Sequence, residues 1–213
     1  MGQATASNSS RDRAVSKSRK HNLADQIREG TGIPCVWFVS LIMVAKVQDL
    51  KTLLIIGYGN PDREDDGVAW HILRALTLKL GLAAPESYED EFPEFARIDF
   101  AFHLQLTPEM AEDISAYEYV CFVDAHTGNI PEPVRLINVE SEFQASPFTH
   151  HLTPQSLLSM CETIYGKKPD AALLSVLGQR FLFSRQLSKE TARLVHPSVE
   201  LVWDWIHARK ILE

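Results

Sequence analysis

Four carboxylates crowd one short segment of the sequence, Gly57–Gly67 (GYGNPDREDDG), which contains Asp62, Glu64, Asp65 and Asp66. Carboxylate oxygens gathered in one loop are ligands that suit a cation. The alternative is that Asp65 and Asp66 only satisfy the N-terminus of a following helix and its dipole. Asp62 and Glu64 are expected to be solvated charges in either case. The residue types indicate either a cation site or a helix cap, and the loop by itself does not separate the two.

The same segment resembles the start of a dinucleotide-binding loop, because Gly57 and Gly59 follow an apolar run. Asp62 stands where the third glycine of that fingerprint belongs. Pyrophosphate beside four carboxylates would be repelled, and Arg63 is the one basic residue in the loop that offsets them. We therefore do not expect a nucleotide here.

A further carboxylate, Asp124, ends the apolar run Tyr119–Val123 (YVCFV). An ionised acid at the end of a buried strand is costly without a partner, so a cation or a dense set of hydrogen-bond donors is expected nearby. The alternative is a turn-forming Asp that leads into Thr127 and Gly128. From the residues alone, both interpretations remain open.

Two adjacent histidines, His150 and His151, precede a predicted helix. Imidazole is the commonest metal ligand at neutral pH, and adjacent side chains on a loop point in different directions, so one of the two is expected to face a site. The alternative is a capping loop with two exposed histidines. His103 and His126, at strand ends, are further candidates.

Alternating strand-like and helix-like segments must position these residues. Apolar runs predict strands at Leu53–Gly57, Arg97–His103, Tyr119–Val123, Val134–Val139 and Ala171–Leu177, the fourth of them antiparallel or at an edge. Helical spacing and capping residues predict helices at Gly67–Leu80, from Thr107-Pro108-Glu109 onward, at Pro154–Tyr165 after Thr153, and after Ser188, with Pro197 dividing or kinking the last region before Val199–Leu212. This pattern predicts an α/β fold: a three-layer, doubly wound, mainly parallel five-stranded sheet with helices on both faces. In such a sheet, ligands bind beyond the carboxyl ends of the strands.

The composition fits a globular protein. Of the 213 residues, 45% are hydrophobic and 23% charged, which predicts one domain that we place at residues 50–213. Residues 1–49 are expected to be a disordered or misannotated extension with Met43 as the start we favour, since the first twenty residues show no hydrophobic period. The apolar run Val36–Ala45 is too short to span a bilayer, so no membrane is expected as a partner.

Charge and cysteine usage narrow the class further. A net charge of −7 argues against nucleic acid as a partner. Cys35, Cys121 and Cys161 are far apart and form no CxxC pair, which favours a reduced, cytoplasmic compartment. No GxSxG elbow, HExxH helix or recognisable Cys–His pair is present to suggest another nucleophile.

Four stretches, in the right order and spacing, resemble the hydrogenase maturation proteases. They are GYGNPDREDDGVAWHIL, FVDA (Phe122–Ala125), THHLTPQSLLSMCETIYGKKP (Thr149–Pro169) and LSVLGQRFLFSRQLS (Leu174–Ser188). The resemblance covers roughly residues 50–210, and four ordered matches are more specific than any one of them.

The resemblance implies a metal-dependent, aspartic-type endopeptidase (a hydrolase) that removes the C-terminal peptide of a nickel-loaded nickel-iron hydrogenase large-subunit precursor. Carried over by position, Asp66, Asp124 and His150 would bind the nickel, or another divalent metal, that the precursor supplies. Asp66 and Asp124 would also be the catalytic residues. Three ligands leave an incomplete shell, so we expect the isolated protein, a monomer, to hold metal weakly.

The same resemblance assigns substrate binding to Gly59 and Asn60. Better-known members carry an Asp-Gly-Gly-Thr-like stretch after the second strand, whereas this chain has Phe102–Thr107 (FHLQLT) there. That departure resembles a less-characterised branch of the family and makes His103 and Gln105 candidates for lining the cleft.

Two alternatives remain. The first is a non-catalytic chaperone that checks nickel on the large subunit and cuts nothing, which the altered Phe102–Thr107 segment would fit. The second is a peptidyl-tRNA hydrolase-like enzyme, because Gly-x-Gly-Asn-Pro also opens that family. The acidic loop would repel tRNA phosphates, and the Thr-Arg-His-Asn-like segment of that family is absent.

Overall fold

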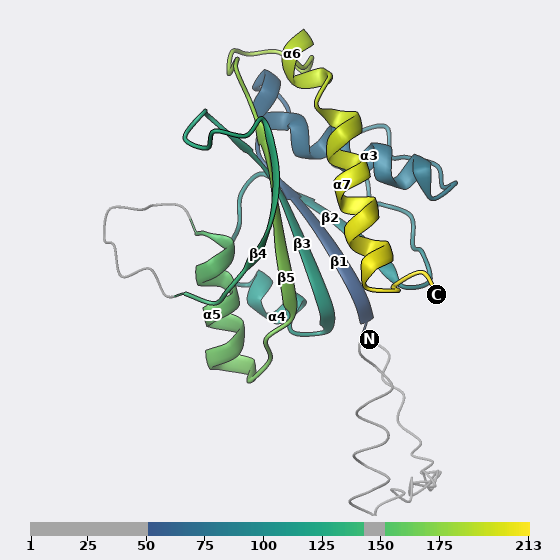
Figure 1. Ribbon diagram of the computed structural model, residues 1–213, viewed down its shortest axis with the longest axis vertical. Coiled ribbons are helices and arrows are strands. Elements are labelled where there is room, and N and C mark those ends of the chain that lie inside the picture. Colours follow the sequence, from purple (N-terminus) through teal and green to yellow (C-terminus); the bar gives the residue numbers. More distant parts are fainter. Residues whose placement is uncertain (1–50, 143–151) are drawn as a thin grey trace, which may run out of the picture. The chain divides into compact units, whose positions relative to one another are not determined.

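The computed structural model describes residues 51–142 and 152–213, and within them five strands form one sheet (Figure 1). The sheet has the order β2-β1-β3-β5-β4, with β1 to β3 and β5 parallel and β4 antiparallel at one edge. The strands are β1 (Lys51–Tyr58), β2 (Ile98–His103), β3 (Tyr117–His126), β4 (Val134–Val139) and β5 (Asp170–Leu177). The predicted sheet is therefore confirmed, including the edge position and direction of its fourth strand.

The apolar run of β1 is continuous because both faces of this strand are buried. Leu53 and Ile55 point into a core on one side of the sheet, and Leu54 and Ile56 point into a second core on the other side. All four side chains are at most 5% exposed. A strand covered on both sides is stabilised by apolar residues at every position, which removes the usual alternation with polar residues.

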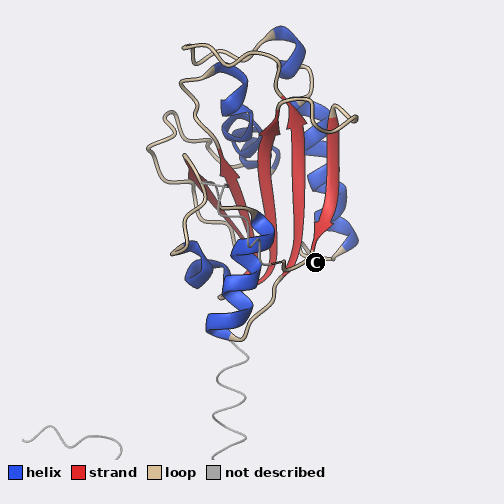
Figure 2. Ribbon diagram, turned by 90° about the vertical axis from the view of Figure 1, so that its left-hand side faces the viewer, coloured by secondary structure: helices blue, strands red, loops and turns tan. Residues whose placement is uncertain are grey.

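Helices cover both faces of the sheet, which gives the three layers expected from the sequence (Figures 1 and 2). On one face α3 (Val68–Lys79) packs beside α7 (Val195–Ala208). On the other face α4 (Met110–Ile114) packs beside α5 (Pro154–Tyr165). Two short helical segments, η1 (Glu64–Gly67) and α6 (Lys189–Ala192), lie in the loops beyond the carboxyl ends of the strands.

Two helix boundaries differ from the prediction. The helix expected from Thr107 begins at Met110, because the carbonyls of Thr107 and Pro108 accept bonds that form turns before the helix. Pro197 does not divide the last helix: α7 starts at Val195, so Pro197 lies in its first turn, where a missing N–H breaks no helical hydrogen bond.

The connections of the sheet change direction at one point, between β1 and β3, where doubly wound sheets have a crevice at the carboxyl ends of the strands. From its carboxyl end, β1 continues through α3 on one face to β2, whereas β3 continues to β4 and then through α5 on the other face to β5, on the opposite side of the β1–β3 pair. Neighbouring strands β1 and β3 thus have connections that leave in opposite directions, and ligands of doubly wound sheets bind at such a switch point. Tyr58 ends β1 there, and Asp124 lies near the end of β3.

The described cysteines, Cys121 and Cys161, are buried in the cores on opposite sides of the sheet and are not joined in a disulfide. Burial raises the pKa of Cys121 to about 12 and also raises the pKa of Cys161. Neither thiol is therefore suited to act as a nucleophile. None of the helices in residues 51–142 and 152–213 has the length and hydropathy needed to cross a bilayer.

Candidate functional site at the carboxyl ends of the strands

The loop after β1 folds back sharply onto its own end, and Gly59 makes this possible. Its backbone has φ +136°, a conformation that side chains disfavour. A Cβ atom at this position would lie 2.1 Å from the carbonyl oxygen of Asp66. The glycine therefore allows the backbone of Asp66 to approach the end of β1, which brings its carboxylate to the crevice.

Asn60 holds the loop in this shape. Its side-chain oxygen accepts the backbone N–H of Asp62 at 2.9 Å, and its own backbone N–H donates to Oδ2 of Asp66 at 3.1 Å. Asp66 is half-buried, and this is the one hydrogen bond recorded for its carboxylate among the described residues. Gly59 and Asn60 thus position Asp66, while their direct contact with a substrate stays a prediction.

Asp124 lies beside Tyr58, whose hydroxyl donates a hydrogen bond to its carboxylate. The N–H of Ala125 donates to Oδ1 of Asp124 at 2.8 Å. Burial raises the pKa of Asp124 to about 7, and the nearby charge of Asp66 adds to this rise, although the two hydrogen bonds oppose it. Burial, together with the charge of Asp124, also raises the pKa of Tyr58 well above its usual range.

The structure therefore brings Asp66 and Asp124 together at the crevice between β1 and β3. No Lys, Arg or His pairs with either carboxylate within residues 51–142 and 152–213. No cluster of three or more metal-ligating side chains occurs in the same residues. The third predicted ligand, His150, lies outside the described residues, so the described part of the site supplies two oxygen ligands.

His103 approaches the site from the neighbouring strand. As the last residue of β2 it pairs with Tyr58 in the sheet, and its carbonyl accepts the N–H of Gly59 at 3.1 Å. Burial lowers the pKa of the imidazole, which favours its neutral form. His103 also borders a hollow of about 700 Å³ that is lined by β2, α4 and Tyr88–Pro93 and reaches neither Asp66 nor Asp124.

Gln105 and His126, which are also proposed from the sequence for this site, differ from each other in burial. Gln105 is exposed in the loop after β2. His126 is buried, its Nδ1 accepts the N–H of Gly128 at 3.2 Å, and its Nε2 has no partner in the described part of the chain. The turn at Thr127-Gly128 is therefore stabilised by His126, and Asp124 instead bonds the N–H of its own neighbour.

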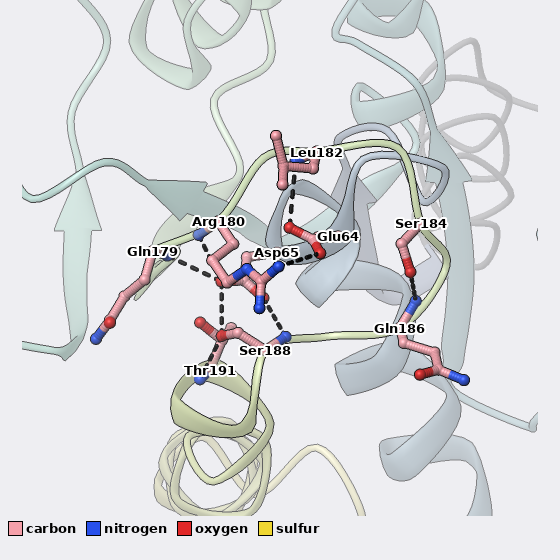
Figure 3. A network of polar contacts seen from close by, with 9 residues as sticks. All are labelled: Glu64, Asp65, Gln179, Arg180, Leu182, Ser184, Gln186, Ser188 and Thr191. Atoms are coloured by element: carbon pink, nitrogen blue, oxygen red, sulfur yellow. Dashed lines mark hydrogen bonds and ion pairs between the residues drawn. The ribbon is translucent and has the colours of Figure 1, made fainter.

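A second group of carboxylates in the loop has a different role (Figure 3). Asp65 is fully buried. Its Oδ2 accepts the backbone N–H groups of Gln179 and Arg180, each at 2.9 Å, and the hydroxyl of Ser188 at 2.8 Å. Its Oδ1 accepts the N–H of Ser188 at 2.7 Å. Burial opposes ionisation, but these bonds lower the pKa of Asp65, so the residue ties the first loop to the segment before α6.

Glu64 is part of the same connection and is not the solvated charge expected from the sequence. Its side chain is buried, Oε2 accepts the N–H of Leu182 at 3.2 Å, and Oε1 lies 3.4 Å from the guanidinium of Arg180. Asp62 is more exposed, yet it too has partners: Arg185 at 2.6 Å and the hydroxyl of Tyr88 at 3.1 Å. The expectation of a solvated charge is therefore wrong for Glu64, whereas Asp62 stays at the surface and has its partners there.

Tyr58 was missed by sequence reasoning although it lies within the resemblance. Its position after four buried apolar residues is the signal that could have found it, because a polar group at that point must face the carboxyl end of the sheet. The hydroxyl of Tyr58 and the carboxylate of Asp124 form a half-buried pair that no sequence spacing indicates.

Comparison with known proteins gives a fold match. No protein-family model matches the sequence, and no curated protein matches it either. The hydrogenase maturating endopeptidase HybD from Escherichia coli is 16% identical, with a TM-score of 0.56 over 74% of this chain and 93% of that one. An endopeptidase from Escherichia coli, solved in solution, is 17% identical with a TM-score of 0.55 over the same shares of the two chains.

A third solved structure is the nickel-iron hydrogenase maturation protease HycI from Thermococcus kodakarensis. It is 16% identical, with a TM-score of 0.51 over 76% of this chain and 96% of that one. At such identities the matches establish the fold alone. The resemblance stated from the sequence is confirmed at that level: the chain has the fold of the hydrogenase maturation endopeptidases.

Proposed function

We propose that the chain is an endopeptidase that removes a C-terminal peptide from a nickel-loaded hydrogenase large-subunit precursor. The observation that carries this proposal is the meeting of Asp66 and Asp124, two carboxylates without a cationic partner among the described residues, at the switch point of the sheet. The fold it shares with proteins named as hydrogenase maturation endopeptidases supplies the reaction class.

In this proposal Asp66, Asp124 and His150 present two oxygens and one imidazole to the nickel that the precursor carries. Such a set suits a divalent metal and leaves positions open for the ligands that the precursor already provides. A bound metal would polarise a carbonyl or lower the pKa of a water molecule. Because the set is incomplete, the protein would read nickel without removing it.

Hydrolysis needs a group that takes the proton from water while the oxygen attacks the scissile carbonyl, and later gives a proton to the departing amine. A carboxylate of the pair supplies this group. Tyr58 and Ala125 orient Asp124 for the task, since each donates a hydrogen bond to it. Asn60 fixes Asp66 through its backbone N–H.

The test is the intact mass of the nickel-loaded precursor after incubation with the protein. The wild type is expected to produce a discrete, nickel-dependent C-terminal mass loss, and Asp124→Asn to slow it at least ~100-fold, as expected for loss of a proton-transfer group. Asp204→Asn is the matched control, because Asp204 is exposed on α7 and no described residue pairs with it. Equal rates with wild type and Asp124→Asn would contradict the proposal.

The alternative of a non-catalytic chaperone is favoured by one observation: both described cysteines are buried with raised pKa values and cannot attack a peptide bond. A stable complex with an uncut, nickel-loaded precursor would establish this alternative. A cytoplasmic location, a monomeric state and weak metal binding in isolation stay predictions.

A further inference from the structure

A row of polar side chains crosses the sheet at the level of Asp124. The register pairs Asp124 on β3 with Ser175 on β5, and Ser175 with Arg135 on β4. On the other side of Asp124, Tyr58 on β1 pairs with His103 on β2. Residues directly opposite one another in a sheet point to the same face, so this row runs along one side of the sheet at its carboxyl end.

Arg135 points to the face that also carries Asp124. Its neighbours Val134 and Leu136 pack against the core under α3 and α7, and side chains alternate along a strand, so Arg135 lies on the side of α4 and α5. Ser175 lies on the same side, because Leu174 and Val176 belong to the opposite core. Ser175 is 4% exposed and lies directly beside Asp124 in the sheet.

Arg135 has no partner for its guanidinium within residues 51–142 and 152–213. Its Nε atom is shielded from solvent and has no hydrogen-bond acceptor among the described residues. Other arginines of the chain have a carboxylate or carbonyl partner: Arg74, Arg180, Arg185 and Arg209. The carboxylate of Asp124 is engaged by Tyr58 and Ala125 and does not satisfy Arg135.

An unpaired, half-buried guanidinium is unfavourable, because its donors lose water without gaining an acceptor. The planar fork of an arginine matches both oxygens of a carboxylate. Arg135 is two strands from Asp124, which corresponds to roughly 10 Å between their Cα atoms at ~4.8 Å per strand. If the cleaved bond of a peptide lies at Asp124, that spacing suits an anionic group one to three residues from this bond along the peptide.

We propose that Arg135, assisted by the hydroxyl of Ser175, binds a carboxylate of the peptide substrate beside the cleavage site. This inference rests on the proposed endopeptidase function. The carboxylate comes either from an Asp or Glu side chain or from the C-terminus of the substrate. Replacing the acidic side chain by its amide removes the first source, and amidating the C-terminus removes the second.

The first experiment measures binding and needs no cleavage. The Nε–H resonance of Arg135 in a ¹⁵N-labelled protein, assigned by its loss in Arg135→Lys, is followed during titration with three peptides from the precursor's C-terminal segment. One carries a Glu with an amidated end, one a free C-terminus with Gln, and one neither. A saturable shift with an acidic peptide, absent with the neutral one, is expected. No shift with either acidic peptide would overturn the proposal.

The second experiment separates binding from chemistry. Arg135→Gln is expected to raise KM at least tenfold and to leave kcat within about threefold, since the lost contact is made equally in the bound substrate and the transition state. Arg135→Lys, which keeps the charge without the fork, should fall between. Arg97→Gln is the matched control, because Arg97 is exposed at the opposite end of the sheet. An unchanged KM with a reduced kcat would overturn the proposal.

The two experiments also distinguish failures. If the wild type binds the acidic peptides through Arg135 but cleaves no precursor, the endopeptidase function fails and the carboxylate site stands. If the wild type cleaves acidic and neutral substrates with equal KM, the carboxylate site fails and the function stands. Should Arg135→Gln not fold, the comparison of acidic and neutral substrates on the wild type provides the same test.

Discussion

Asp65 and Asp66 are adjacent in the loop after β1, yet they belong to two different regions of the molecule. Asp65 faces the segment before α6 and accepts hydrogen bonds from Gln179, Arg180 and Ser188. Asp66 faces the crevice, where one backbone N–H donates to it and a second carboxylate, Asp124, lies close by. The same residue type is thus saturated with donors in one region and left short of them in the other.

The difference shows in the pKa values. Hydrogen bonds lower the pKa of Asp65 against the effect of burial, whereas burial raises the pKa of Asp124 to about 7. A carboxylate that the protein satisfies internally ties two loops together. A carboxylate that the protein leaves short of donors must obtain compensation from outside, as a proton, a cation or a substrate group.

The strongest test of this comparison is Asp65→Asn. The amide would place its NH₂ group against backbone donors, leaving buried polar groups unpaired, so a loss of about 3 kcal/mol in the free energy of unfolding is expected. Urea denaturation at neutral pH measures it. Because the pKa of Asp65 is lowered in the folded state, the wild-type advantage is present above the ordinary Asp pKa and is lost as the pH falls through the folded value.

Asp62→Asn is the control for this experiment, because Asp62 lies in the same loop but its bond to Arg185 is exposed. We expect a much smaller change there. If both substitutions destabilise the protein equally, the contrast between a structural and a solvated acid in this loop is wrong.

An effect of opposite sign is expected for Asp124→Asn. With a folded pKa of about 7, the folded state binds a proton that the unfolded state releases above its own, ordinary pKa. Wild-type stability therefore falls as the pH rises from about 4 to about 7. In metal-free buffer at about pH 8, the variant should be more stable than the wild type, by at most the ~4 kcal/mol that a shift of about three pKa units corresponds to, and near pH 4 the two should be equal. Urea midpoints at both pH values decide this; a destabilised variant at pH 8 would contradict it.

The fold could be predicted well from the sequence, because apolar runs and helix-capping residues are strong local signals. Four apolar residues in a row, ended by Gly57, favour a short strand buried on both faces, as β1 is. Thr153 caps α5 as expected, with its side chain accepting the N–H of Ser156. The position of Asp66 and Asp124 on one sheet edge also followed from strand direction alone.

The roles of the acids in the first loop could not be separated in the same way. Asp65 and Glu64 obtain their donors from residues 179–188, more than one hundred positions later in the chain. No periodicity or spacing reports such a contact. The row through Ser175 and Arg135 was missed for a related reason, since it depends on the register between β3, β5 and β4.

Tyr58→Phe sharpens the description of the crevice. The Tyr58 hydroxyl lowers the pKa of Asp124, so its removal should raise that pKa above about 7 while changing the fold little. The rise in the pKa is expected to correspond to the loss of one hydrogen bond to a charged group, about 1.5–3 kcal/mol at most, which is roughly one to two pKa units. A ¹³C carboxyl titration of Asp124 measures it directly. An unchanged titration would mean that Tyr58 does not donate to Asp124 in solution.

The smallest effect is expected for Arg185→Gln. Arg185 contacts Asp62 at 2.6 Å and lies over the ring of Tyr88, but its side chain is 72% exposed. Exposed ion pairs contribute little, because water screens the charges and ordering two long side chains costs entropy. The urea midpoint should therefore move by less than in Asp65→Asn or Asp124→Asn, and moderate salt should remove the difference. A loss comparable to that of Asp65→Asn would show that the outer side of the loop, and not its buried acid, holds the first loop in place.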